Sequence, residues 1–429
     1  MKILRELVRR NRAGSGEALA SVCSAHPDVI SASLLLAKAH DTGLLVEATS
    51  NQVNQFGGYT GMTPATFVRF VHELADRQGV ERERVAFGGD HLGPQAWRDQ
   101  PAPVAMALAV EMVQDYARAG YEKIHLDCSE GCVGESAQVG DMLSAERAAE
   151  LAQACETAAP DGRLSYVFGT EVPPPGGARA AEVGAAISPT TPTAARATIA
   201  AHEAAFLHRK LGDAWERAVG LVVQPGLEFG PDHIDRFSLD SPNLLSDVLS
   251  VRPCLAFEAH STDYQTPQTF PALAKRHFAV LKVGPALTFA YREALYALDG
   301  IAAWVVSGAA PQTLPRIMDK LMLAEPAFWA KHYQGDPARL RILRHFSYAD
   351  RIRYYWSGPE AAAATARLRA SLETAPLPSP LLSQYFGEAT LVRADALRGR
   401  CGQVEALIYA RIQDALEPYF ACAPASRPQ

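Results

Sequence analysis

The stretch RVAFGGDHLGP, residues 84–94, decides the fold prediction. It begins with a short apolar run, typical of a buried β-strand, and ends in glycines, an aspartate and a histidine. Seven other runs between residues 20 and 285 share this form, an apolar stretch followed by polar side chains or turn residues. They are ASVCSAH (20–26), LLVEATS (44–50), KIHLD (123–127), LSYVFGTE (164–171), GLVVQPGLE (220–228), CLAFEAH (254–260) and AVLKVGP (279–285).

Helical patterns separate these runs, for example at 64–78, 102–119, 144–157 and 193–211. A strand followed by a helix, repeated eight times, predicts an α/β protein whose parallel sheet closes into a (β/α)8 TIM barrel. An open doubly wound sheet is the alternative. After about residue 290, Ala- and Leu-rich helical stretches alternate with aromatic clusters. We therefore predict the barrel over 1–300, and the last barrel helix region with a helical C-terminal extension over 301–429.

Composition excludes several classes of protein. The 429 residues are 48% hydrophobic and 21% charged, which is typical of a globular chain rather than a disordered one. The formal net charge of -6 gives no indication of nucleic-acid binding. The apolar runs are shorter than the ~20 residues of a membrane helix. Seven cysteines without a CxxC pair favour free thiols. We expect a cytoplasmic protein that binds neither nucleic acid nor membranes.

Polar side chains follow most of the predicted strands. In a closed barrel these strand ends lie on one rim, so the groups converge. In GGDHLGP (88–94), the adjacent Asp90 and His91 point in different directions, so His91 can bind a metal while Asp90 acts as acid or base. Glu258 and His260 are two apart and share a face, which is costly to bury without a metal or partner. A capping aspartate or a histidine in a surface turn is the alternative interpretation.

The sequence leaves two alternative roles for several further residues. Glu228 follows the sixth run, and Glu171 ends the fifth where the chain leaves the sheet. Glu47 and Asp127 are either acid/base groups on the inner rim or buried ion-pair partners of Lys282. Lys282 is also a candidate for Schiff-base chemistry in a metal-free aldol cleavage, which would leave the two histidines without a role.

Substrate contacts are expected around the same rim. A phosphate group fits Ser261, Thr262 and the Gly284 region, because the last two strand ends of many barrels bind one. The glycine-rich loop NQFGGYTGMTP (54–64) is a candidate substrate contact, although it is not a GxxxxGK[ST] phosphate loop. RIRYYW (351–356) is interpreted as packing, with arginines able to reach the rim.

Longer strings support a family resemblance over residues 21–356. They are SVCSAHP, EATSNQVNQFGGYTGMTP, GGDHLGP, KIHLD, GTEVPPPGG, VVQPGLEF, EAHSTDYQT, LKVGPALTFA and DRIRYYW. With these strings the chain resembles the tagatose-bisphosphate aldolase accessory-subunit family (GatZ/KbaZ-like). This family is similar to the class II, metal-dependent aldolases and has a (β/α)8 barrel.

The resemblance implies a metal site. It makes Asp90 the acid/base and His91 and His260 ligands, and it places Glu228 where the aldolases have a further histidine. That difference leaves Zn, Mg or Mn open as the divalent ion. Glu171 is expected to act as the counterpart of Asp90 on the other face of the substrate.

The family includes epimerases and non-catalytic partners, so two functions are predicted. The first is a C4-epimerase that interconverts D-tagatose 6-phosphate and D-fructose 6-phosphate by metal-assisted retro-aldol/aldol chemistry. The alternative is a non-catalytic accessory subunit of a D-tagatose-1,6-bisphosphate aldolase complex in galactitol/tagatose catabolism. Chemistry favours the first, because only an enzyme needs this set of acid, base and ligand side chains. The expected partners are a phosphorylated ketose and either a second copy of the chain or a separate aldolase subunit.

Overall fold

A computed structural model describes residues 2–169, 187–309 and 312–424 of the chain. Within these residues eight strands, all parallel to their neighbours, close into a barrel in the order β1-β10-β9-β6-β5-β4-β3-β2. The prediction of a TIM barrel is confirmed. The barrel strands are β1 (Leu19–Val22), β2 (Leu44–Thr49), β3 (Val85–Leu92), β4 (Lys123–Leu126), β5 (Ser165–Phe168), β6 (Ala218–Val222), β9 (Ala256–Ala259) and β10 (Phe278–Val283). A two-stranded antiparallel hairpin, β7 (Glu228–Phe229) and β8 (Ile234–Asp235), follows β6.

Helices surround the barrel, and their first turns explain where they begin. Thr63 and Thr191 each accept a hydrogen bond from the backbone N–H group three residues on, and a proline follows each of them. The helices around the strands are α2 (Pro27–Ala39), α3 (Pro64–Arg77), α4 (Ala102–Arg118), α5 (Asp141–Ala158), α6 (Pro192–His208), α7 (Gly212–Glu216), the 3-10 helix η4 (Ser246–Val251) and α8 (Thr269–Ala274).

The N-terminal helix α1 (Lys2–Arg12) closes one end of the barrel. Its Leu4, Leu7 and Val8 are buried in one apolar cluster with residues from six of the barrel strands, including Leu19 and Val219. Several of these strand residues, such as Leu19 in β1 and Val219 in β6, lie at or next to the beginnings of their strands. Burial of apolar side chains therefore seals the N-terminal end.

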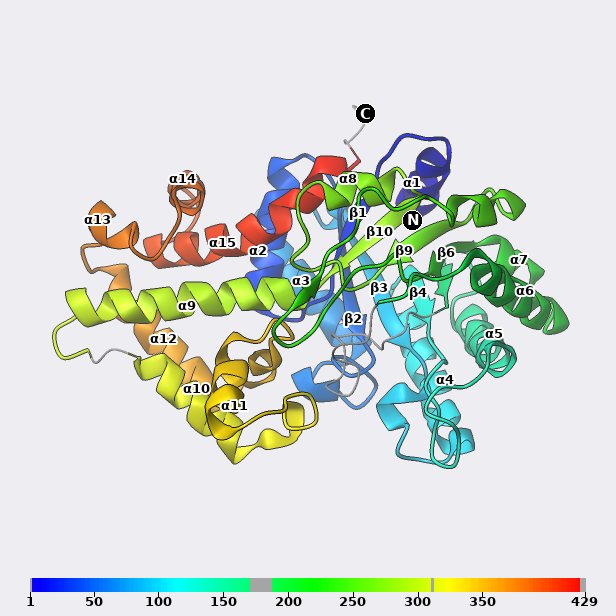
Figure 1. Cartoon of the computed structure of the whole chain (residues 1–429), viewed down its shortest axis with the longest axis horizontal. Helices are drawn as coiled ribbons and strands as arrows, with labels where there is room; N and C mark the ends of the chain where they lie inside the picture. The colour runs from blue at the N-terminus through cyan, green and yellow to red at the C-terminus, as the bar shows by residue number, and fades with distance from the viewer. Residues whose placement is uncertain (1, 170–186, 310–311, 425–429) are drawn as a thin grey trace.

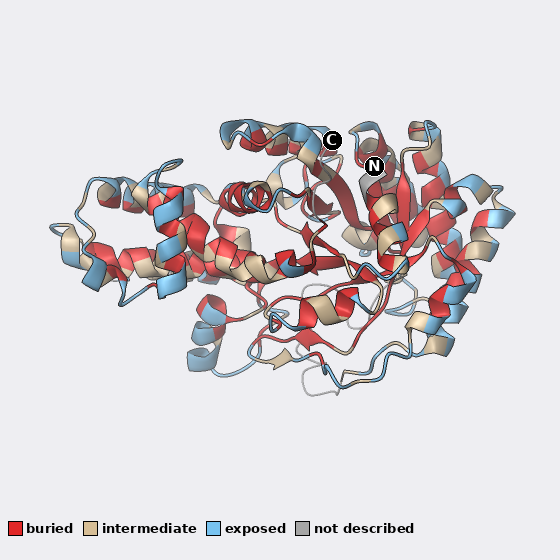
Figure 2. Ribbon diagram, turned by 90° about the horizontal axis from the view of Figure 1, so that it is seen from above, coloured by how far each residue is buried: buried red, intermediate tan, exposed pale blue. Residues whose placement is uncertain are grey.

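The C-terminal part of the chain forms a helical lobe beside the barrel. Helix α9 (Pro285–Val305) leaves the last strand and extends away from the barrel with the later helices around it (Figure 1). Buried residues continue from the barrel along these helices (Figure 2), so the lobe shares the main hydrophobic core. The remaining elements are α10 (Thr313–Ala324), α11 (Pro337–Phe346), η6 (Arg351–Tyr355), α12 (Pro359–Glu373), α13 (Ser379–Leu382), α14 (Glu388–Leu397), α15 (Gln403–Leu416) and η7 (Glu417–Cys422).

The lobe returns to the barrel at two places. Helix α15 packs against α9 and α2, and the segment η7 packs against α8 and β1. Residue 300 lies inside α9, so this helix crosses the boundary that we predicted between barrel and extension. The division of the chain stays a prediction.

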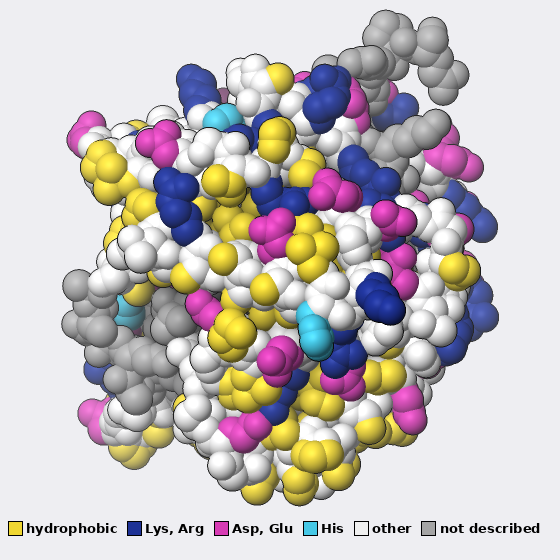
Figure 3. Space-filling view, turned by 90° about the vertical axis from the view of Figure 1, so that its right-hand side faces the viewer, with side chains coloured by type: hydrophobic (Ala, Val, Ile, Leu, Met, Phe, Trp, Pro, Cys, Tyr) yellow, Lys and Arg dark blue, Asp and Glu magenta, His cyan; other side chains and the backbone are white. Residues whose placement is uncertain are grey.

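The surface agrees with the mixed composition of the sequence. On the face shown in Figure 3, lysine and arginine side chains alternate with aspartate and glutamate, and neither sign dominates a broad area. Among the described residues no helix is both long and apolar enough to cross a membrane. All seven cysteines are free, as predicted.

Candidate active site

Four side chains from three strands, β3, β4 and β9, meet in the barrel although β9 is not adjacent to the other two. Asp90 and His91 lie at the end of β3, His125 lies in β4, and His260 follows β9. All four are buried, and their candidate ligand atoms lie within 4.8 Å of one another. The ring of His91 lies 4.7 Å from that of His125 and 4.8 Å from that of His260, centroid to centroid. The tertiary structure thus brings together Asp90, His91 and His260, as the sequence predicts.

The protonation of the histidines fits a metal site. Burial lowers the pKa of His125 to about 4 and that of His260 to about 3, and the nearby His91 lowers both further. These rings are therefore neutral at pH 7, which is the form that binds metal ions. The imidazoles of His91 and His260 with the carboxylate of Asp90 are a donor set that suits a divalent ion such as Zn.

Asp127 orients the ring of His91. Its Oδ2 lies 2.8 Å from His91 Nδ1, and its Oδ1 accepts hydrogen bonds from the backbone and hydroxyl of Ser129. Although burial alone would raise it, the pKa of Asp127 is held well below its usual range by the bond to His91. A carboxylate behind a histidine leaves the other ring nitrogen available to a metal. In this structure Asp127 is a positioning group and not an ion-pair partner of Lys282.

His125 is the member of the cluster that the sequence analysis missed. Its Nδ1 accepts the backbone N–H of His91 at 3.1 Å, and its Nε2 lies 3.0 Å from the carbonyl oxygen of Gly169. These bonds place the proton on Nε2. The available signal was the alternation in KIHLD, which puts Lys123, His125 and Asp127 on the same face of one strand.

A network of buried charges lies beside the cluster. Lys123 Nζ sits between Glu47 at 2.6 Å and Glu258 at 2.7 Å, and none of the three is exposed to solvent. Burial alone would lower the pKa of Lys123, but the two carboxylates raise it above its usual value. Ser21 also donates a hydrogen bond to Glu47. Glu47 is therefore buried in an ion pair, but its main partner is Lys123 and not the predicted Lys282, which lies 3.8 Å away.

Lys282 links this network to Asp90. Its Nζ bonds to Asp90 Oδ1 and lies 3.6 Å from Glu258 and 3.8 Å from Glu47. A Schiff-base lysine is activated by desolvation or by neighbouring cations, whereas Lys282 is surrounded by carboxylates. This environment favours a role in orienting Asp90 over nucleophilic catalysis.

Glu228 lies outside the four-residue group. It belongs to the hairpin strand β7, where its Oε1 accepts the backbone N–H of Phe229 at 2.9 Å. Burial raises its pKa to about 8, and the charges of Asp263 and Asp235 add to this effect. The structure places His125 in the cluster instead of Glu228. Glu171 lies outside the described residues, and its catalytic role stays a prediction.

Most of the groups that we predicted to bind a phosphate make hydrogen bonds within the protein instead. The hydroxyl of Thr262 donates to the carbonyl oxygen of Lys282 and contacts the Tyr419 hydroxyl at 3.0 Å. The N–H of Gly284 donates to Asp263 Oδ1 at 3.0 Å. Ser261 lines the cavity, but Thr262 and Gly284 are engaged in holding the last two strand ends together.

The glycines of GGDHLGP make room for protein atoms. A Cβ atom at Gly88 would lie 2.7 Å from the Glu47 side chain, and one at Gly93 would lie 1.7 Å from the carbonyl oxygen of Asp127. These close approaches bring β2 and β4 against β3. The motif is thus required by the packing of the residues that surround the cluster.

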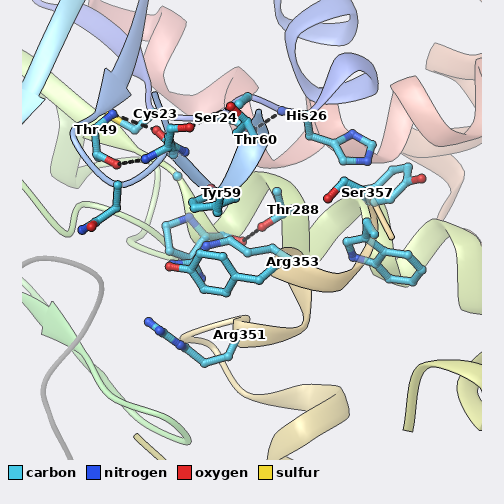
Figure 4. Close-up of a pocket in the computed structure, with 18 of the residues that line it drawn as sticks. Cys23, Ser24, His26, Thr49, Tyr59, Thr60, Thr288, Arg351, Arg353 and Ser357 are labelled. Carbon is cyan, nitrogen blue, oxygen red and sulfur yellow. Dashed lines mark hydrogen bonds between the residues drawn. The ribbon is translucent and has the colours of Figure 1, made fainter. Parts of the chain in front are cut away.

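The cluster opens into a cavity of about 860 Å³ between the barrel and the C-terminal lobe. Asp90, His91 and His260 line its inner part. The lobe contributes Arg351 and Arg353, which come from η6 and lie near Tyr59 and Thr288 (Figure 4). A volume of this size suits a small phosphorylated sugar.

The chain is similar to proteins with related descriptions. A D-tagatose 6-phosphate 4-epimerase from Agrobacterium fabrum (strain C58 / ATCC 33970) is 47% identical over 428 residues, which is 99% of each chain. A crystal structure described as a probable tagatose 6 phosphate kinase from Sinorhizobium meliloti 1021 is 44% identical, covers 95% of this chain and 100% of its own, and has a TM-score of 0.85. A putative fructose-1,6-biphosphate aldolase structure from Coccidioides immitis matches at 13% identity over 86% of this chain and 100% of its own, with a TM-score of 0.44.

The match to a family model extends over nearly the whole chain, well beyond the strings quoted from the sequence. It spans residues 4–424, from the helix that seals the barrel to the end of the C-terminal lobe. The chain therefore belongs to the GatZ/KbaZ-like family, described as D-tagatose-1,6-bisphosphate aldolase subunit GatZ/KbaZ-like.

Proposed function

We propose that this protein interconverts D-tagatose 6-phosphate and D-fructose 6-phosphate by inverting C4. The observation that supports this most directly is the cluster of Asp90 and three histidines at the base of the cavity. The similarity to the Agrobacterium epimerase supports the same substrate pair. The donor set fits a divalent ion, and His91 and His260 are the side chains that we propose to hold it.

The chemistry of the substrate determines which route is available. The C4 hydrogen of a 2-ketohexose phosphate is β to the carbonyl and is not acidic, so direct proton removal from C4 is slow. Breaking and remaking the C3–C4 bond avoids this problem. A bound divalent ion supplies a Lewis acid that polarises the C2 carbonyl and stabilises the negative charge developing on the C1–C3 fragment.

Asp90 is proposed as the base. Its carboxylate accepts the proton of the C4 hydroxyl while the C3–C4 bond breaks, and C4 becomes an aldehyde. After the aldehyde turns to present its other face, C3 attacks it, and the C4 oxygen takes up a proton. Lys282 bonds to Asp90, and we propose that this contact holds the carboxylate in its reactive orientation. Glu171 is the proposed proton carrier on the second face.

The test uses the purified chain alone with tagatose 6-phosphate and each of Zn, Mg and Mn, without ATP. We expect fructose 6-phosphate to form, and chelation to abolish its formation reversibly. Replacing the base, as in Asp90→Asn, is expected to lower kcat by about 10²- to 10⁴-fold. Asp247→Asn, at an exposed position, is the matched control.

Two outcomes would contradict the proposal. The first is the absence of turnover with every ion tested. The second is full activity in the Asp90→Asn variant. If the isolated chain is inactive but stabilises a separate class II aldolase and raises its activity, the accessory-subunit alternative is correct.

A further inference from the structure

The cavity contains a second polar region, away from the histidine cluster, that the proposed reaction does not use. It lies between the segment η6 of the C-terminal lobe and the loop after β2, which includes Tyr59 and Thr60. The rings of Tyr59 and Tyr354 meet edge to face across it, with their centroids 4.9 Å apart. A role for this region in binding rests on the proposed sugar-phosphate substrate.

The N-terminus of α9 is a poor position for the phosphate of that substrate. Asp263 Oδ1 accepts the N–H of Gly284 at 3.0 Å and that of Ala286 at 2.8 Å. A helix N-terminus binds anions through these N–H groups, so a carboxylate already occupies the position. A phosphate placed beside Asp263 would meet a group of like charge.

Five cationic side chains line the cavity: Arg98, Lys282, Arg351, Arg353 and Arg369. Three of them already have carboxylate partners. Arg98 pairs with Glu130 at 2.6 Å, Arg369 with Asp28 at 2.7 Å, and Lys282 with Asp90. Neither arginine of η6 lies within ion-pair distance of a carboxylate in the part of the chain that the structure describes.

The two arginines of η6 differ in what their nitrogens do. Arg353 donates Nη1 to the carbonyl oxygens of Ala349 and Asp350 and Nη2 to the Tyr354 hydroxyl at 2.9 Å. Arg351 donates only its Nε, to the carbonyl oxygen of Phe328, in the bonds that the structure describes. Its Nη1 and Nη2 thus remain available for a planar, two-point contact with an oxyanion.

The environment of Arg351 favours an anion as its partner. Its guanidinium carbon lies 4.8 Å from the centre of the Tyr354 ring, which fixes the plane of the group. Burial lowers the pKa of Arg351, and the nearby positive charge of Arg353 adds to this effect. A dianionic phosphate would compensate both charges.

We propose that Arg351 binds the phosphate group of the substrate at a subsite between η6 and the loop 54–64, and that Arg353 is a positioning residue that holds Tyr354 and the backbone of η6. The two sequence motifs that the barrel chemistry left unexplained, RIRYYW and the glycine-rich loop, thereby form one binding region. The sugar carbons extend from it along the cavity toward Asp90 and His91.

The test measures binding without turnover. Fructose 6-phosphate and inorganic phosphate are titrated into the wild-type protein and into Arg351→Gln, Arg351→Lys and Arg98→Gln variants by calorimetry. We expect Arg351→Gln to raise the Kd for fructose 6-phosphate at least tenfold and to abolish competition by inorganic phosphate. Arg351→Lys should recover part of the affinity, and Arg98→Gln should change Kd less than twofold.

Thermal unfolding without ligand shows whether each variant is folded. Wild-type affinity for both probes in a folded Arg351→Gln variant overturns the subsite, as does an equal loss in Arg98→Gln. If Arg351→Gln unfolds, the Arg351→Lys variant is tested in its place. Wild-type affinity for fructose 6-phosphate and wild-type competition by inorganic phosphate in Arg351→Lys would overturn the two-point contact. A wild-type protein that turns over tagatose 6-phosphate but shows no effect of Arg351 keeps the proposed function and loses only the subsite. A protein that binds fructose 6-phosphate through Arg351 without epimerising it keeps the subsite and loses the proposed function.

Discussion

The two ends of the barrel use the same strands for different purposes. At the N-terminal end, Leu7 and Val8 of α1 pack with apolar strand residues such as Leu19 and Val219. Toward the C-terminal end the buried positions carry lysines, carboxylates and histidines, as at Glu258, His260 and Lys282. The first end supplies stability and the second supplies chemistry, which is the division expected of TIM barrels.

The difference shows how the buried charges are tolerated. A lysine such as Lys123 is costly to bury alone, and its cost is offset only by the two carboxylates within 2.7 Å. The apolar layer beneath contributes the favourable burial energy that an isolated charge network lacks. A mutation in the apolar layer should therefore change stability without changing activity.

The largest expected effect on stability comes from breaking the charge network. Lys123→Met leaves Glu47 and Glu258 without a counter-charge, so we expect the free energy of unfolding to fall by about 3–5 kcal/mol. Lys320→Met is the control, because Lys320 is 71% exposed in its pair with Glu360 and should change stability by less than about 1 kcal/mol. Urea unfolding measures both, and equal losses would show that the buried network is not special.

The apolar end should respond differently. Leu7→Ala removes a fully buried side chain from the cluster that seals the barrel, and we expect a loss of about 3 kcal/mol. The kcat of the folded fraction should stay unchanged, because the site lies at the opposite end. Leu207→Ala, at a position that is 53% exposed, should lose far less stability. A fall in kcat with Leu7→Ala would show that the two ends are coupled.

A smaller effect on the free energy of unfolding is expected at acid pH from His202, which lies in helix α6 outside the barrel interior. Burial lowers the pKa of His202 to about 4 from 6.5, and its Nδ1–H donates to the carbonyl oxygen of Thr198. The unfolded chain takes up the proton first as the pH falls below 6.5, so His202 should cost about 2 kcal/mol of stability between pH 7 and pH 5. Above pH 6.5 its contribution is constant.

The His202→Gln variant tests this linkage. We expect its unfolding free energy to vary less with pH than that of the wild type over this interval, by about 2 kcal/mol. Identical pH dependence of the two proteins would mean that His202 is protonated in the folded state.

The smallest predicted effect is on metal affinity at the C-terminal end of the barrel. Asp127→Asn removes the carboxylate behind His91 without changing its size, so we expect metal affinity to fall on the order of tenfold. Titration of the metal-free protein with Zn measures the effect, with Asp247→Asn as the control. Unchanged affinity would mean that the bond between Asp127 and His91 does not tune the site.

Much of the barrel was predictable because its signals are local. The run 84–94 contains the whole of β3, and the pattern 64–78 ends one residue beyond α3. Local reasoning failed where one run contained a turn. GLVVQPGLE reads as a single strand, but β6 ends at Val222, because Pro225 and Gly226 lead the chain out into the hairpin that holds Glu228.

The residues of the site show the same limit of reasoning from local sequence. Asp90, His91 and His260 were found because each stands at the end of an apolar run. His125 was missed because it lies within such a run, where burial usually indicates packing. The pairing of Lys123 with Glu47 and Glu258 joins residues that are far apart in the sequence, and no local pattern specifies it.

By itself the sequence determined the alternation of strands and helices, the apolar character of each strand and the reactive groups at the strand ends, because these depend on neighbouring residues and on periodicity. Only the tertiary structure decided which of those groups meet, since closure of the barrel sets the distances between strands. It also brought η6 back over the cavity, where Tyr354 meets Tyr59 of the loop after β2, because packing of the C-terminal lobe against the barrel is a long-range effect with no local signature.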